Sequence, residues 1–106
     1  IYSSGSELAQ RRLFASTSHG DLTPLFSGFF DTAVGPKLEA ASYRRIVSAL
    51  AHEPASTLFV SDVTRELRAA EAAGCQTRLC IRPGNVIQTD ADRYTSVTSL
   101  AAISVP

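Results

Sequence analysis

The chain has 106 residues, of which 44% are hydrophobic and 19% charged, and its ten basic side chains are balanced by ten acidic ones. This length fits one small domain with a modest core, and the absence of net charge argues against a general binder of nucleic acid or of anionic membranes. No apolar run in the sequence approaches the roughly 20 residues of a membrane span.

Short strands and helices are predicted to alternate along the chain. In order, the predicted elements are a strand end at 1–4, a helix at 6–17, a loop at 19–28 with one helical turn after Asp21, a strand at 29–32, a helix at 35–50, a strand at 57–62, a helix at 63–74, a strand at 76–82 and a short strand near 97–100. Ser6 suits a helix N-cap, Pro36 suits a first helical turn, and Gly74 suits a helix end.

The predicted strands are continuously apolar, and helices separate them. This pattern indicates right-handed crossovers and a mainly parallel α/β sheet covered by helices on both faces. Ligands of such sheets bind beyond the carboxyl ends of the strands. Cys75 and Cys80 lie beside or within a predicted strand, which favours reduced core thiols in a cytosolic protein over a disulfide.

Hydroxyl groups follow the first predicted strand, where Ser3 and Ser4 precede Gly5, Ser6 and a helix start. Free backbone N–H groups and hydroxyls at such a point suit an anion. An ordinary capped turn is the alternative interpretation of the same residues.

Lys37 follows the next strand, near the first turn of the predicted helix at 35–50. A cation at a helix N-terminus opposes the helix dipole, so an anionic ligand would explain its position. The alternative is a solvated surface lysine.

Asp62 closes the apolar strand at 57–62, with Thr64 and Glu66 close behind. An aspartate in this position can bind Mg²⁺ through oxygen. It can equally serve as the N-cap of the following helix, where Asp is among the best residues.

Hydroxyl donors, a lysine and a metal-type carboxylate at successive strand ends are the parts of a phosphoryl-transfer site. No convincing nucleophile accompanies them, and His19 and His52 are predicted to be surface residues. A small doubly wound binding module without catalysis, of the receiver or flavodoxin kind, is therefore kept as an alternative, and the fold alone would not separate the two.

Several stretches, in this order, resemble the C-terminal half of the enolase-phosphatases, or acireductone synthases, a family of haloacid dehalogenase-like hydrolases. They are "IYSSGSELAQRRLF", "GDLTPLFSGFFDTAVGPKLEAASYRRI", "LFVSDVTRELRAAEAAG" and "RPGN". The resemblance implies a Rossmann-like core, Mg²⁺ as cofactor, a cytoplasmic location and a role in methionine salvage. It also implies enolisation of the phosphorylated small molecule 2,3-diketo-5-methylthiopentyl 1-phosphate and removal of its phosphate to give the acireductone.

The resemblance assigns Ser3, Ser4 and Lys37 to the phosphate and Asp62 to the metal, and it assigns no role to Glu66. The family's acidic pair in a D-x-E-G-T-T context is absent from this sequence. The nucleophilic aspartate, the central strand that carries it and the cap are expected before Ile1. Residues 1–106 are thus expected to be the C-terminal part of one core domain, inactive alone, with the missing N-terminal half as partner.

Overall fold

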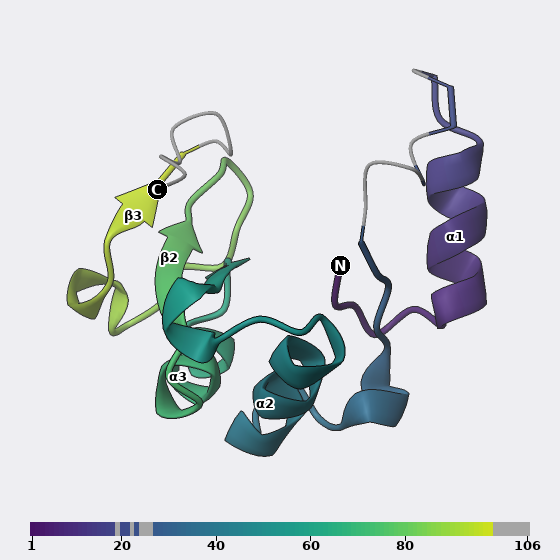
Figure 1. Ribbon diagram of the computed structural model, residues 1–106. Helices are drawn as coiled ribbons and strands as arrows, with labels where there is room; N and C mark the ends of the chain where they lie inside the picture. Colours follow the sequence, from purple (N-terminus) through teal and green to yellow (C-terminus); the bar gives the residue numbers. More distant parts are fainter. Residues whose placement is uncertain (19, 22, 24–26, 99–106) are drawn as a thin grey trace.

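A computed structural model describes residues 1–18, 20–21, 23 and 27–98, and Figure 1 shows how its elements are arranged. The helices are α1 (Glu7–Ala15), α2 (Ala40–Ala49) and α3 (Thr64–Ala72), and the strands are β1 (Leu58–Ser61), β2 (Gln76–Cys80) and β3 (Ser96–Val97). Three short 3-10 turns are η2 (Thr32–Val34), η3 (Pro54–Ser56) and η4 (Ala91–Arg93). The helical turn predicted after Asp21 and the end of the last strand at 99–100 include positions outside the described residues.

The strands form a parallel sheet in the order β1-β2-β3. Leu58 pairs with Gln76 at one end of the β1–β2 ladder, and Leu79 pairs with Ser96 in the β2–β3 ladder. Helix α3 connects β1 to β2 and packs against both. The parallel α/β class predicted from the sequence is therefore confirmed.

The two earliest predicted strands are shorter than expected. Tyr2 and Phe30 form one parallel bridge, in which Ser3 N donates to Phe30 O at 3.1 Å and Phe30 N donates to Ile1 O at 2.7 Å. Thr32, predicted to end the second of these strands, instead begins η2, because the Asp31 side chain caps that turn by accepting from Ala33 N. In Figure 1 this N-terminal part, with α1, stands apart from the sheet, and α2 lies between them.

Tyr43 of α2 connects the two parts. Its ring lies edge-on to Phe59 of β1, with centroids 4.8 Å apart, and edge-on to Tyr2, with centroids 5.6 Å apart. The buried cluster around it consists of Tyr43, Val47, Ala69, Ala70, Ala73 and Cys75. Cys75 and Cys80 are both buried and free, as predicted.

Gly74 ends α3 as predicted. Its φ of +97° lies in the left-handed region that favours glycine. The Gly74 N–H donates to Glu71 O at 2.8 Å, and the Cys75 N–H donates to Ala70 O at 3.0 Å, which is the Schellman pattern. None of the helices in the described ranges has the length and apolar character needed to cross a membrane.

Candidate phosphate and metal site

Ser3 and Ser4 lie in the turn between the Tyr2–Phe30 bridge and α1. Ser3 is half-buried and Ser4 exposed. The hydroxyl of Ser3 accepts from Gly5 N at 3.2 Å, whereas the N-cap of α1 is Ser6, which accepts from Ala9 N at 3.1 Å. Ser6 therefore caps α1, as predicted. Helix capping does not explain the presence of Ser3 and Ser4.

Two side chains that the sequence analysis did not single out hold this turn. Asp31 Oδ2 accepts from Glu7 N at 2.9 Å while its Oδ1 accepts from Ala33 N at 2.8 Å. These N–H donors hold the pKa of Asp31 below its usual value. Buried Gln10 donates from Nε2 to Gly5 O at 2.9 Å and to Phe30 O at 2.7 Å. The turn that carries Ser3 and Ser4 is thus fixed from both sides.

Lys37 precedes α2 and is not in its first turn, because α2 begins at Ala40 and not near Pro36 as predicted. The cause is local. The Ser42 hydroxyl donates to Pro36 O and the Tyr43 hydroxyl donates to Lys37 O, both at 2.6 Å. The Pro36 carbonyl also accepts from Glu39 N at 3.2 Å, which is the i to i+3 bond of a turn and not the i to i+4 bond of an α-helix. The argument from the helix dipole therefore does not apply to Lys37.

The side chain of Lys37 is held between two elements. Its Nζ lies 3.5 Å from Glu66 Oε1, at the start of α3, and 5.6 Å from the centroid of the Tyr2 ring. The Tyr2 hydroxyl in turn donates to Gly35 O. The lysine side chain is 28% exposed, so it is not the solvated surface residue that the sequence left as an alternative.

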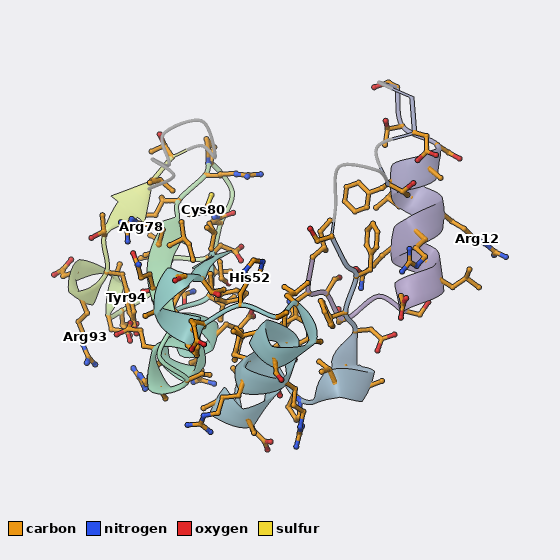
Figure 2. All side chains as sticks on the ribbon, viewed as in Figure 1. Arg12, His52, Arg78, Cys80, Arg93 and Tyr94 are labelled. Atoms are coloured by element: carbon orange, nitrogen blue, oxygen red, sulfur yellow. The ribbon has the colours of Figure 1, made fainter. Side chains whose placement is uncertain are left out.

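Asp62 is exposed directly after β1. The N-cap position of α3 is Val63, which makes no side-chain cap, and the N–H of Thr64 donates to Gln88 Oε1 at 3.1 Å instead. The N-cap alternative for Asp62 is therefore wrong. Asp62 lines a cavity of about 200 Å³ together with Cys80 at the end of β2, whose position is labelled in Figure 2.

One carboxylate is a small part of a metal site. Within the described ranges, no group of three or more His, Cys, Asp or Glu side chains is arranged to hold a metal ion. The donor chemistry of Asp62 nevertheless suits Mg²⁺, which commonly takes one or two carboxylates and completes its shell with phosphate oxygens and water. His52 is exposed after α2 (Figure 2), and His19 lies outside the described residues.

A cavity of about 410 Å³ separates β1 from the N-terminal bridge. Its lining includes Ile1 and Tyr2 of the N-terminal segment, Phe59 and Val60 of β1, and Tyr43 of α2. In the described sheet β1 has β2 as its neighbour on one side and no strand on the side of this cavity. The ion pair between Lys37 and Glu66 joins the segment before α2 to the first turn of α3.

The parallel α/β sheet flanked by helices agrees with the haloacid dehalogenase-like class expected from the sequence. The solved structure of the UTR4 protein from Saccharomyces cerevisiae matches the fold with a TM-score of 0.86 and 33% identity, over 97% of this chain and 49% of that one. No protein-family model matches the chain.

Over most of its own length the chain is similar to proteins named enolase-phosphatase. It is 58% identical over 85 residues to enolase-phosphatase E1 of Synechococcus elongatus, which covers 80% of this chain and 36% of that protein. It is 52% identical over 103 residues to the enzyme of the same name from Azotobacter vinelandii, which covers 97% of this chain and 44% of the relative. The chain thus spans less than half the length of these relatives.

Proposed function

We propose that this chain is the phosphate- and metal-binding part of a magnesium-dependent enolase-phosphatase. The whole enzyme would enolise 2,3-diketo-5-methylthiopentyl 1-phosphate and hydrolyse its phosphate to give the acireductone, in the methionine salvage pathway of the cytoplasm. The observation that carries the proposal is the match, over 97% of the chain, to a relative named for both chemical steps.

Each proposed site residue contributes one property to the phosphate site. The hydroxyls of Ser3 and Ser4 donate hydrogen bonds to phosphate oxygens, from a turn fixed by Asp31 and Gln10. Lys37 supplies a positive charge that neutralises the phosphate. The carboxylate of Asp62 would hold Mg²⁺, and the bound ion would supply further charge neutralisation at the phosphate. The exposure of Asp62 and its exclusion from the α3 cap support this assignment.

The cavity beside β1 supports a proposal about the rest of the enzyme. We expect a strand from the part that this chain does not span to fill it, pairing with β1 and with the segment around Tyr2. The walls fit such an occupant, because they combine apolar side chains such as Phe59 and Val60 with the unpaired side of β1. That strand is where the nucleophilic aspartate is expected, so residues 1–106 would be the C-terminal part of one core domain.

The test uses a chimera, defined as the Azotobacter vinelandii relative with the aligned segment replaced by this chain. We expect the purified chimera to convert the diketone phosphate to the acireductone, with release of inorganic phosphate that requires Mg²⁺. Enolisation is followed by absorbance and phosphate by a colorimetric assay. A chimera that folds but carries out neither step would contradict the proposal and favour a non-catalytic module.

A further inference from the structure

Gln10 is a buried polar residue in a helix whose other side chains are exposed or half-buried. Of the nine residues of α1, all of them described, Gln10 alone is buried, at 5% exposure. The apolar Leu8 and Leu13 of the same helix are 57% and 68% exposed. Apolar packing does not explain this pattern, because hydrophobic side chains normally take the buried positions of a helix.

The amide of Gln10 joins the two ends of the turn that carries Ser3 and Ser4. Its Nε2 donates to Gly5 O at 2.9 Å, just after the two serines, and to Phe30 O at 2.7 Å. Phe30 O also accepts from Ser3 N at 3.1 Å, so Ser3 and Gln10 share one acceptor. The two N–H bonds of a side-chain amide suit this position because both of its neighbours are carbonyls.

Gly5 connects this amide to the hydroxyl of Ser3. Gly5 O accepts from Gln10, and Gly5 N donates to Ser3 Oγ at 3.2 Å. A serine hydroxyl accepts through its lone pairs and has one proton to donate. The bond from Gly5 therefore orients the Ser3 oxygen from inside the turn and leaves its proton available for an acceptor outside the turn.

The other amide atom indicates that Gln10 does not serve stability alone. Gln10 Oε1 is buried and has no hydrogen-bond partner among the described residues. A buried acceptor without a partner destabilises a fold, and an unbranched apolar side chain such as Met would fill a similar space without it. The two bonds donated by Nε2 are thus what distinguishes glutamine from an apolar residue here.

We propose that Gln10 is a positioning residue that acts through Gly5, holding the hydroxyls of Ser3 and Ser4 in place for the substrate phosphate. This inference rests on the proposed function, which supplies the phosphate. It concerns the binding of phosphate and not of the metal, because Asp62 lies on another segment, directly after β1.

The test compares Gln10→Met with Gln76→Met in the chimera. Gln76 is an exposed glutamine of β2 whose Nε2 also donates to a backbone carbonyl, that of Ala55, at 2.7 Å. Gln10→Met should lower kcat/KM and weaken inhibition by inorganic phosphate, each about 10- to 100-fold, because misplacing a group by about 1 Å can cost that much. The Mg²⁺ concentration for half-maximal activity should not change. Gln76→Met should leave both kinetic quantities close to those of the unsubstituted chimera.

A double-mutant cycle separates positioning from general stability. In a chimera that already carries Ser3→Ala and Ser4→Ala, Gln10→Met should have almost no further effect on kcat/KM, because the hydroxyls through which it acts are gone. An equal loss in both backgrounds would overturn the inference, and so would unchanged inhibition by phosphate. Gln10→Asn, which keeps the amide on a side chain one methylene shorter, takes the place of Gln10→Met in the cycle if the Met variant does not fold.

Amide hydrogen exchange of the chimera tests the inference without turnover. Gln10→Met should speed exchange at Gly5, whose N–H is bonded to Ser3, more than at Ala9, whose N–H is bonded to Ser6. Equal acceleration at both amides would show that the whole start of α1 has loosened, and an unchanged Gly5 rate would show that Gln10 does not hold the turn. Either result would contradict the inference, whereas absent turnover in the unsubstituted chimera bears on the proposed function alone.

Discussion

Tyr2 and Phe59 line the same cavity and both pack edge-on against the ring of Tyr43, with centroids 5.6 and 4.8 Å from it. Helix α2 therefore holds the N-terminal bridge and β1 in place although no hydrogen bond of the described sheet joins them. The burial of Tyr43 raises the pKa of its phenol, so this contact carries no charge at neutral pH. Within the described sheet, this arrangement leaves β1 without a partner strand on the side of the cavity.

The first prediction concerns residues 1–106 expressed alone. No strand of the described sheet pairs with the cavity-facing side of β1, and a backbone group that is buried without a partner costs about 1–3 kcal/mol. Several such groups would rival the roughly 5–15 kcal/mol by which whole domains are stable. We expect an aggregated, swapped or weakly protected species without phosphatase activity, as measured by sedimentation, hydrogen exchange and turnover. A cooperative, well-protected monomer would show that the account of β1 is wrong.

The second prediction concerns the metal. Asp62→Asn in the chimera should reduce Mg²⁺-dependent turnover by about 100-fold or more, since even residues that only support a metal ligand commonly cost 10- to 100-fold. The fold should be retained, because Asp62 is exposed and does not cap α3. A magnesium titration of turnover, with thermal unfolding alongside, checks both halves. Unchanged activity across the titration would remove Asp62 from the metal site.

The third prediction concerns the positive charge on Lys37. Lys37→Met in the chimera keeps much of the side-chain stem and removes the charge, so kcat/KM should fall by about 10²–10³-fold, as when one charge-stabilising donor is lost. The melting temperature should also fall, because Glu66 loses the partner of its ion pair, but kcat/KM should fall far more than the stability does. Arg12→Met is the control, because Arg12 is an exposed cation on α1 that points away from the molecule in Figure 2. Normal turnover combined with early melting would make Lys37 a structural residue.

The fourth prediction separates phosphate binding from helix capping within one turn. Ser3→Ala together with Ser4→Ala should raise KM or lower kcat, because hydroxyl donors to the phosphate are lost. Ser6→Ala should instead cost about 1 kcal/mol of stability through loss of the α1 cap, with kinetics close to those of the unsubstituted chimera. Denaturant unfolding and steady-state kinetics on both variants provide the comparison. If Ser6→Ala impaired the kinetics and the Ser3→Ala, Ser4→Ala variant only lost stability, the proposed roles of these serines would be wrong.

Features set by neighbouring residues could be predicted from the sequence. Ser6 caps α1 through Ala9, and Gly74 ends α3 with its N–H bonded to the carbonyl of Glu71, three residues before it. The parallel order of the strands also followed, because apolar runs separated by helices permit few other arrangements.

Features that depend on distant partners could not be predicted in this way. Gln88 accepts from the first N–H of α3 across 24 positions, and this removed the capping alternative for Asp62. Asp31 joins η2 to the start of α1 across a similar separation. The late start of α2 depends on which carbonyls the hydroxyls of Ser42 and Tyr43 reach. Spacing along the sequence carries no signal for such contacts.

The central claim is that Lys37 and the Ser3–Ser4 turn bind a phosphate, and Asp62 binds a metal ion, at the carboxyl edge of a sheet that another strand of the enzyme completes. A crystal structure of the chimera with Mg²⁺ and inorganic phosphate tests it most directly. We predict that a strand of the surrounding enzyme pairs with β1 beside Phe59, that the metal lies on Asp62, and that phosphate oxygens contact Lys37 and the hydroxyls of Ser3 or Ser4. A sheet in which β1 keeps its open edge, or a phosphate bound away from Lys37 with no metal on Asp62, would contradict the account.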